Sequence, residues 1–318
     1  MKPKVWQKKN TPPPPQKNLL ILAACFYSAV FTGRHQNNIF LLFYSQLNKL
    51  NSKHYITLRY RVHISAGSTD GIFCEGIIGG REAAPHSRPY MASIQVPEGD
   101  TLKHECGGFV VADQWVMTAV HCMPNGANGR KVVLGVHSLS EAEDTKQTFD
   151  IMELHNHPDF SIENYDNDIA LIKLDRPFNA SDAVRAVELL RAGGTNPDTG
   201  AAVETAGWGS LDNLGSRPGK LKEVVIEVIN RVKCRRTDYF GRKFTDNMIC
   251  AHKVCRENCG DSGGPLLYNG VAVGITSNGG KKCGQVKKPG IYTIISHFTE
   301  WIDNTMGTQP AAAPQEAS

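Results

Sequence analysis

Three short segments of the chain supply a histidine, an acid and a serine, in that order. The residues are His121, Asp168 and Ser262, and they stand in the motifs Thr118-Ala-Val-His121-Cys122, Asn167-Asp168-Ile-Ala-Leu171 and Gly260-Asp-Ser262-Gly-Gly-Pro265. A serine hydroxyl is a poor nucleophile until a neighbouring base takes its proton, and imidazole suits that task because its pKa lies near neutrality. A buried carboxylate holds the ring in the right tautomer and stabilises the imidazolium. The motifs therefore predict acyl transfer, with Ser262 as nucleophile, His121 as general base and then acid, and Asp168 as orienting carboxylate.

Two acids compete for the orienting role. Asp166 and Asp168 are close enough in sequence that either could face the histidine, but Asp168 directly precedes an apolar run and is the one we expect to be buried. The glycines around Ser262 let backbone N–H groups approach an oxygen that becomes negative during acyl transfer. Such donors contribute about 3–4 kcal/mol each.

Most of the remaining chain is typical of an all-β protein that could position these residues. Short apolar runs alternate with Gly- and Pro-rich turns, which favours a sandwich or barrel of antiparallel strands. Examples are Tyr90–Val96, Gly108–Val111, Trp115–Ala119, Lys131–Leu134, Ile169–Leu174, Ala202–Ala206, Val224–Val228, Leu266–Leu267, Val271–Thr276 and Gly290–Ile295. One helix is predicted at Ser296–Met306, where Phe298, Trp301, Ile302 and Thr305 recur at helical spacing.

Charge divides the chain at Ile77. The 318 residues carry a formal charge of +4, but residues 1–76 hold ten basic and two acidic residues, a balance of +8. Residues 77–318 therefore hold 25 basic against 29 acidic residues, a balance of −4, with the two signs interspersed. Because the folded domain shows no cluster of basic residues in its sequence, nucleic-acid binding is not favoured.

Residues 1–76 have little with which to fold, and we expect them to be a largely disordered extension. Leu19–Phe31 is an apolar run of 13 residues, which suits the core of a signal peptide better than a membrane span; a buried or anchoring helix is the alternative. No apolar run of the chain reaches 18 residues, so no stable membrane association is expected. We expect a secreted, extracellular precursor, with a disordered tail at 307–318.

The nine cysteines do not indicate a metal site. No two Cys-x-x-Cys units occur, so we expect no zinc, no other metal and no cofactor. In an exported chain the cysteines of the main body are expected to form disulfides.

Residues 77–306 resemble the chymotrypsin (trypsin-like) family of serine proteases. The resemblance rests on the catalytic motifs and on Ile77-Ile-Gly-Gly80, Cys106-Gly-Gly108, Ala206-Gly-Trp-Gly209 and Lys288-Pro-Gly-Ile-Tyr-Thr293. It implies two six-stranded antiparallel β-barrels followed by the C-terminal helix, with the site in the cleft between them. It further implies a monomeric zymogen in which the freed amine of Ile77 pairs with Asp261. The backbone N–H groups of Gly260 and Ser262 would then form the oxyanion hole.

Within the family, the chain is most similar to the complement factor D (adipsin) branch. The segments are Gly80-Arg-Glu-Ala83, Arg88-Pro-Tyr-Met-Ala-Ser93, Leu134-Gly-Val-His-Ser-Leu-Ser140, Cys234-Arg-Arg-Thr237 and Ser277-Asn278-Gly279. This likeness implies cleavage of factor B bound to C3b, in the alternative pathway of innate immunity. Granzymes share the character of Pro85-His-Ser-Arg-Pro-Tyr90 and are the nearest rival.

The family resemblance implies the pairings Cys106–Cys122, Cys234–Cys250 and Cys259–Cys283. A further bridge of the factor D branch would join positions held here by Val203 and Tyr268, so both partners are missing together. Granzymes typically keep that bridge and lack Cys259–Cys283, so the chain departs from their pattern twice. Cys255 is left over, either free or paired with Cys74.

The specificity pocket departs from the family pattern. Its floor falls on Glu257, beside Asn258, and an acid there favours Arg or Lys substrates, with Ser277, Asn278 and Gly279 beside the bound chain. Cys259 directly abuts Gly260, one residue fewer than the family has. Because small misplacements can cost a hundredfold in rate, the alternative is a catalytically silent homologue that acts by binding.

Two more positions concern regulation. Gly76 precedes Ile77 where most zymogens carry Arg or Lys, which implies either processing by an enzyme that is not trypsin-like or an upstream segment foreign to this chain. Lys281 matches a basic residue that, in the factor D branch, is implied to reach the pocket acid and hold the free enzyme at rest; a solvated loop is the equal alternative.

Overall fold

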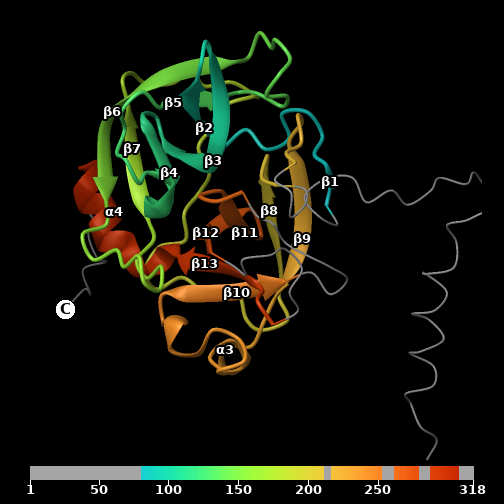
Figure 1. The fold of residues 1–318 in the computed structure, drawn as a ribbon, viewed down its shortest axis with the longest axis vertical. Helices are drawn as coiled ribbons and strands as arrows, with labels where there is room; N and C mark the ends of the chain where they lie inside the picture. Colours follow the sequence, from blue (N-terminus) through green and yellow to red (C-terminus); the bar gives the residue numbers. More distant parts are fainter. Residues whose placement is uncertain (1–79, 211–215, 253–260, 279–286, 308–318) are drawn as a thin grey trace, which may run out of the picture. The chain divides into compact units, whose positions relative to one another are not determined.

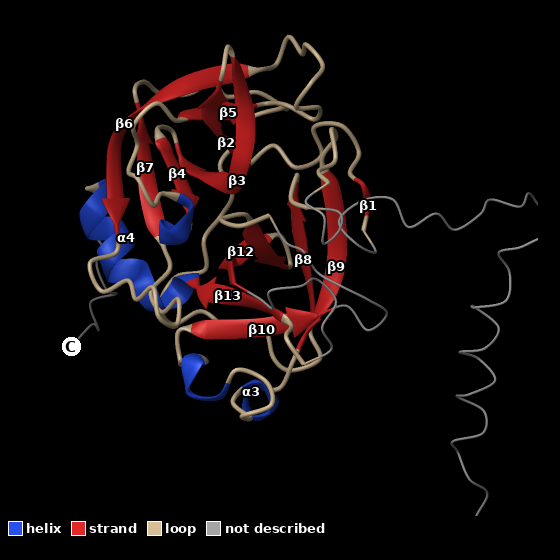
Figure 2. Cartoon of the chain, viewed as in Figure 1, coloured by secondary structure: helices blue, strands red, loops and turns tan. Residues whose placement is uncertain are grey.

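The computed structural model describes residues 80–210, 216–252, 261–278 and 287–307. The predicted extension at 1–76 and residues 308–318 lie outside this set. The described part of the main body folds into two closed antiparallel barrels, one from each half of the sequence (Figure 1), with few helices (Figure 2).

The first barrel has the strand order β2-β3-β4-β7-β6-β5 and closes where β5 pairs with β2. Its hairpin β2–β3 turns at Gly99, whose φ of +61° favours glycine. Ile94 pairs with Cys106 on one side and with Val132 on the other, which fixes the register at the closure. The strands are β2 (Met91–Glu98), β3 (Thr101–Ala112), β4 (Trp115–Thr118), β5 (Lys131–Leu134), β6 (Gln147–Asn156) and β7 (Ala170–Leu174).

The second barrel has the order β9-β10-β13-β12-β11-β8 and closes through the pairing of β8 with β9, while β1 (Arg81–Glu82) adds to the outer edge of β9. Two closed barrels confirm the predicted fold class. The strands are β8 (Ala202–Gly207), β9 (Lys222–Val228), β10 (Met248–His252), β11 (Pro265–Tyr268), β12 (Val271–Asn278) and β13 (Gly290–Ile294).

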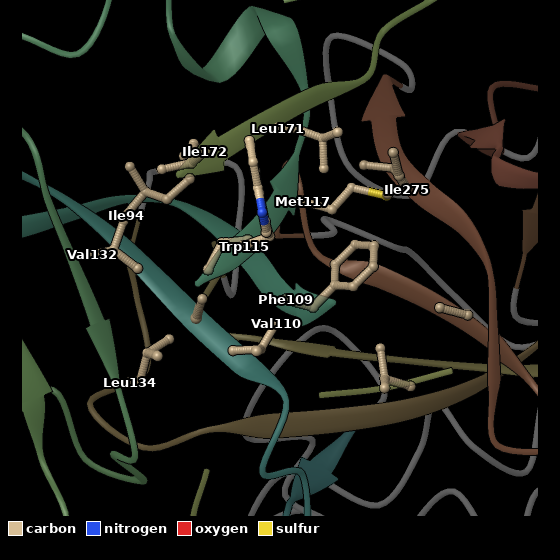
Figure 3. Close-up of a cluster of buried hydrophobic side chains, with 14 of the residues drawn as sticks. Ile94, Phe109, Val110, Trp115, Met117, Val132, Leu134, Leu171, Ile172 and Ile275 are labelled. Carbon is tan, nitrogen blue, oxygen red and sulfur yellow. The ribbon is translucent and has the colours of Figure 1, made fainter. Parts of the chain in front are cut away.

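The larger apolar core fills the first barrel and continues into the second. Phe109, Met117, Leu134 and Leu171 are fully buried in the first barrel. Ile275 of β12 belongs to the same cluster (Figure 3), so the two barrels are joined by shared apolar packing. Each buried side chain of this size contributes roughly 1.5–3 kcal/mol. The two barrels are therefore closely packed against each other at this junction.

The C-terminal helix forms where the spacing predicts it. The 3₁₀ turn η3 (Ile295–Phe298) leads into α4 (Thr299–Met306), which ends at Gly307 with φ of +70°. Ile302 is fully buried against the first barrel's core cluster, so the last element of the chain packs back onto the first half. The described part of the chain also contains three short turns of helix, η1 (Val120–Cys122), α3 (Arg231–Cys234) and η2 (Gly241–Lys243). Across the described ranges no helix is both long and apolar enough to cross a membrane.

Candidate active site

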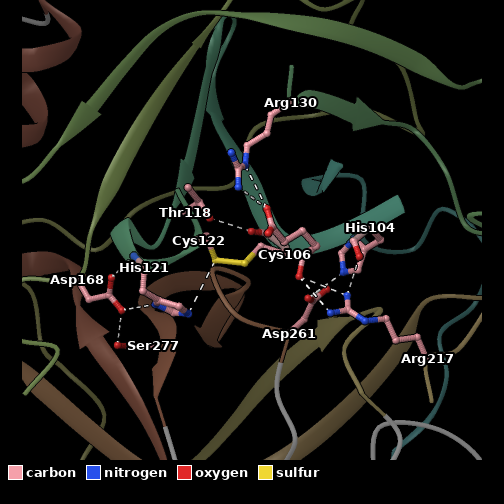
Figure 4. The surroundings of a disulfide bond; sticks show 12 residues. His104, Cys106, Thr118, His121, Cys122, Arg130, Asp168, Arg217, Asp261 and Ser277 are labelled. Atoms are coloured by element: carbon pink, nitrogen blue, oxygen red, sulfur yellow. Dashed lines mark hydrogen bonds and ion pairs between the residues drawn. A yellow bond between two sulfur atoms is a disulfide. The ribbon is translucent and has the colours of Figure 1, made fainter. Parts of the chain in front are cut away.

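His121 lies in η1, directly after strand β4 of the first barrel. The disulfide Cys106–Cys122 joins η1 to β3 (Figure 4) and matches a pairing that the family resemblance implies. The histidine side chain is 17% exposed, so it is fixed by its surroundings while one edge of the ring stays accessible.

Asp168 is fully buried just ahead of β7, and its carboxylate faces His121 (Figure 4). Its Oδ2 lies 2.6 Å from Nδ1 of His121, and its Oδ1 accepts a hydrogen bond of 3.0 Å from the backbone N–H of the same residue. The hydroxyl of Ser277 donates to Oδ2 over 2.5 Å. These three donors satisfy a carboxylate that would otherwise be costly to bury. Because a carboxylate accepts at Nδ1, the ring carries its proton there and presents Nε2 as the base.

The structure separates the two candidate acids. Asp166 accepts hydrogen bonds from Thr245 Oγ1 over 2.6 Å and from Asn247 Nδ2 over 3.2 Å, so it binds the segment that precedes β10. Asp168 alone of the pair contacts His121. The sharp turn between them includes Asn167 in a left-handed conformation, with φ of +57°.

Ser262 lies in a turn pressed against the first barrel. Its carbonyl accepts a hydrogen bond of 2.8 Å from the Gly107 N–H. Gly263 has φ of +82°, and a Cβ there would lie 2.2 Å from Thr118 Oγ1, so only glycine fits. The turn thus brings the serine to the strands that lead to His121. Among the described residues the Ser262 hydroxyl makes no hydrogen bond to His121, a contact that often tightens only when substrate binds.

Asp261 is buried beside the serine and has partners that the sequence did not predict. Its Oδ1 lies 3.0 Å from His104 Nε2, and its Oδ2 accepts a hydrogen bond of 2.8 Å from the Trp208 N–H. His104 in turn contacts Ser93 Oγ through Nδ1 over 2.8 Å. A Cβ on Gly207 would lie 2.2 Å from Asp261 Cβ, so this carboxylate sits in a pocket shaped by a glycine. The predicted partner, Ile77, lies outside the described residues.

Much of the predicted specificity pocket also lies outside the described residues. Ser277 is buried and Asn278 exposed at the end of β12, and Ser277 turns toward Asp168. The other positions predicted for the pocket, the oxyanion hole and the third disulfide are not described: Glu257, Asn258, Cys259, Gly260, Gly279, Lys281 and Cys283. The second predicted disulfide, Cys234–Cys250, is formed.

A wall of the site comes from a residue that the sequence did not single out. The ring of Tyr165 lies edge-on to the His121 ring, with centroids 5.6 Å apart and an interplanar angle of 74°. Tyr165 adopts φ of +61°, which is unusual for a bulky residue and is maintained by the surrounding turn. In the sequence, the one indication that Tyr165 lies near the site is that it stands three residues before Asp168.

Among the described residues, one cluster of side chains of metal-ligand type adjoins the site. Cys106, His121 and Cys122 place their ligand atoms within 4.8 Å of one another. Both sulfurs are joined in a disulfide, however, so neither offers a thiolate to a metal. The cluster is better explained as the anchor of the histidine.

The first barrel carries a histidine paired to a buried aspartate, and the second carries a serine in a glycine-rich turn. This arrangement defines the class of two-barrel serine proteases. The model of the trypsin family matches residues 77–302, and the chain belongs to that family. Family membership identifies it as a serine endopeptidase.

The similar proteins cover several branches of the family. Rat granzyme M is 37% identical over 235 residues, which span 73% of this chain and 89% of that protein. Rat kallikrein-8 is 36% identical over 237 residues, or 73% of this chain and 86% of that protein. A solved structure of neuropsin, a serine protease expressed in the limbic system of mouse brain, has a TM-score of 0.64 at 36% identity and covers 71% of this chain and 98% of its own.

Proposed function

We propose that the mature protein hydrolyses peptide bonds through Ser262, His121 and Asp168. The observation that carries the proposal is the 2.6 Å contact between His121 Nδ1 and a fully buried Asp168. Nε2 of His121 takes the proton of Ser262 as Oγ attacks the substrate carbonyl, and the Gly260 and Ser262 N–H groups receive the negative oxygen. The imidazolium then gives its proton to the leaving amine. Water, deprotonated by the same ring, releases the acyl group.

Cleavage of the chain before Ile77 activates the enzyme in this proposal. In the intact chain the Ile77 nitrogen is an uncharged amide, and Asp261 is bound by His104 and Trp208 instead. Once freed, a charged amine at Ile77 competes with the His104 ring for the buried carboxylate, because a buried charge is strongly favoured by an opposite one. Movement of Asp261 would carry the neighbouring oxyanion N–H groups with it.

The substrate class follows from the pocket expected at Glu257. We propose cleavage after Arg or Lys, by a secreted enzyme of the factor D type that acts on factor B bound to C3b. This finer assignment rests on the segments shared with that branch and on the joint loss of the bridge at Val203 and Tyr268. Both residues pack with the apolar core of the second barrel, Val203 at 1% exposure.

A granzyme-like protease is the second candidate. It is favoured by the 37% identity to rat granzyme M and opposed by the cysteine pattern. A third reading, a silent homologue, is favoured by the shortened junction between Cys259 and Gly260 and by a Ser262 hydroxyl that makes no hydrogen bond to His121 in the described part of the chain.

A panel of peptide esters tests these assignments. The chain cleaved to begin at Ile77 is assayed against matched esters with Arg, Lys, Leu, Met or Asp before the scissile bond, and then against factor B with and without C3b. Hydrolysis confined to Arg and Lys, with factor B cut only in the complex, is expected. Preference for another residue supports the granzyme-like candidate, and no hydrolysis of any ester supports the silent homologue.

A further inference from the structure

Eight cationic side chains gather on one surface of the second barrel, around α3 and η2. Within the same segments lie two carboxylates, Asp238 and Asp246. We call this set the α3 basic surface; its cations are Arg231, Lys233, Arg235, Arg236, Arg242, Lys243, Lys287 and Lys288. The interspersed charges expected from the sequence of the main body do not hold for this region, because 231–243 contains six basic residues and one acidic residue.

Contacts hold the separate segments together as one surface. Asp238 binds Arg236 of the α3 segment and Lys287 of the segment before β13, at 2.9 and 3.0 Å. The Lys288 ammonium lies 4.9 Å from the centre of the Phe240 ring. Lys287 and Lys288 are thus brought to cations that precede them by some 50 positions in the sequence.

The two carboxylates do not neutralise the cations around them. Asp246 is shared by Arg231 and Arg235, just as Asp238 is shared by Arg236 and Lys287. Within the described ranges no carboxylate lies at ion-pair distance from three exposed members, which are Lys233, Arg242 and Lys243. Burial lowers the pKa of Arg231, and repulsion from Arg235 lowers it further. Hydrogen bonds from Arg236 and Lys287 hold the pKa of Asp238 at about 2, so this acid stays ionised and the surface still carries excess positive charge.

The three rings within this surface do not offer an open stacking platform. Phe240 is half-buried, with the Lys288 ammonium over its ring. Tyr239 and Phe244 are buried, at 6% and 3% exposure. The Arg231 guanidinium lies over Phe244, and Lys233 lies 5.7 Å from the Tyr239 ring centre. Single-stranded nucleic acids gain much of their affinity by stacking bases on exposed rings. Val232 is the large apolar side chain exposed here, at 75%, which is too little apolar surface to insert into a bilayer.

We propose that the α3 basic surface binds a linear sulfated polysaccharide. Such a chain supplies closely spaced anionic groups without bases or acyl chains, which matches exposed guanidinium and ammonium groups spread over three segments. Guanidinium groups pair well with such oxyanions through their fork of donors.

The surface adjoins the rim of the candidate active site without filling it. In Figure 1, α3 lies beyond β10, on the side of the second barrel away from the first barrel. Lys243 Nζ nevertheless donates to the carbonyl of Glu163 over 3.1 Å, and Tyr165, two residues further, packs on His121. A bound polysaccharide would therefore hold the protease on an anionic matrix while the cleft remains open to substrate.

Binding of the full chain to immobilised heparin tests the proposal. The variant K233Q/R235Q/R236Q removes three exposed cations of the surface. The matched control K103Q/K146Q/R176Q removes three exposed cations of the first barrel. Because each ion pair with a linear polyanion releases about one counterion, the log–log salt slope should fall by about two to three in the first variant and little in the control. The ten cations of residues 1–76 are common to all the proteins compared.

If the triple variant K233Q/R235Q/R236Q failed to fold, its loss of binding would say nothing about the surface. A variant that is expected to bind heparin more tightly removes this ambiguity. D246N frees Arg231 and Arg235 from a carboxylate that is 83% exposed, and should elute from heparin at higher salt than the wild type. Completely desulfated heparin should not retain the chain. Equal loss in the control triple variant, no gain with D246N, or tighter binding to oligothymidylate or to phosphatidylserine vesicles than to heparin would overturn the proposal.

Discussion

Nδ1 of His121 lies 2.6 Å from Oδ2 of Asp168, and that carboxylate also receives the backbone N–H of His121 and the hydroxyl of Ser277. One fully buried acid therefore holds both the ring and the backbone of His121. This relationship sets the tautomer of the ring and leaves Nε2, which lies 3.9 Å from Cys122 Sγ, without a proton and able to act as the base.

Replacing Asp168 by Asn should lower kcat by about 10⁴-fold with little change in KM, because the amide favours the wrong ring tautomer and cannot stabilise the imidazolium. Steady-state hydrolysis of an Arg ester by the chain cleaved at Ile77 measures this. Asp166→Asn is the matched control: Asp166 binds Thr245 and Asn247 rather than His121, so most activity should remain. Equal losses in both variants would contradict the assignment.

Gly263 should not tolerate a side chain. Alanine there meets Thr118 Oγ1 at 2.2 Å in addition to the strain of a φ of +82°, and should lower the free energy of unfolding by about 2–4 kcal/mol. Gly270 has the same φ with no atom within 4 Å of a Cβ, so Gly270→Ala reports the strain alone, about 1–2 kcal/mol. Urea unfolding of both variants separates the two effects. A Gly263→Ala variant as stable as Gly270→Ala would show that the turn does not press on the first barrel.

His104 should restrain the uncleaved chain. Replacing His104 by Ala removes the side chain that holds Asp261, which shifts the population of the intact chain toward the active arrangement. We expect the intact variant to react with a fluorophosphonate probe several-fold faster than the intact wild type, while the cleaved forms react alike. Ser93→Ala, which removes the contact to His104 Nδ1 together with a hydrogen bond from Gln95 Nε2, should have a smaller effect in the same direction. Unchanged labelling of the intact H104A chain would count against the activation proposal.

We expect His157 to lower the free energy of unfolding of the protein when the pH falls below about 6.5. Its ring packs against Phe298 and Trp301, with centroids 5.1 and 5.2 Å away, and burial lowers its pKa below the ordinary value of 6.5, although Asp159 and Asp166 partly oppose this. Between the lowered pKa of the folded chain and the ordinary value of 6.5, the unfolded chain binds more protons at this histidine than the folded chain does. The contribution of neutral His157 to stability is therefore complete above pH 6.5 and is lost as the pH falls from 6.5 to the lowered pKa.

The test for His157 is the urea midpoint at pH 7.5 and at pH 5, in the wild type and in His157→Gln. The wild type should lose more stability between the two conditions. Burial also lowers the pKa of His252, but that histidine is present in both proteins. An identical loss in the two proteins would contradict this role of His157.

The sequence predicted the barrels correctly, and it could propose a candidate triad, because the patterns behind both are local. Apolar runs bounded by turn residues mark most strands, and the chemistry of His121, Asp168 and Ser262 is written in contiguous motifs. Strand β6 was missed because it is half exposed and mixes polar with apolar residues along its length. Strand β10 was not singled out either, because the sequence of Met248–His252 runs on into Lys253 without a turn residue to mark its end.

Relationships between distant segments were not predictable in the same way. The contact of His104 with Asp261 joins residues 157 positions apart. The α3 basic surface depends on the fold bringing Lys287 to Asp238, and no local pattern encodes such a meeting. The choice of Asp168 over Asp166 was open to prediction only because burial follows from the apolar run that comes next.

The central claim is that Ser262 is a nucleophile activated by His121. The most direct test is to treat the chain, cleaved to begin at Ile77, with a fluorophosphonate probe and to locate the adduct by peptide mass, with His121→Ala as the control. We predict stoichiometric labelling at Ser262 in the wild type, and labelling slowed by several orders of magnitude in His121→Ala. No adduct at Ser262, or equal labelling of the two proteins, would contradict the account.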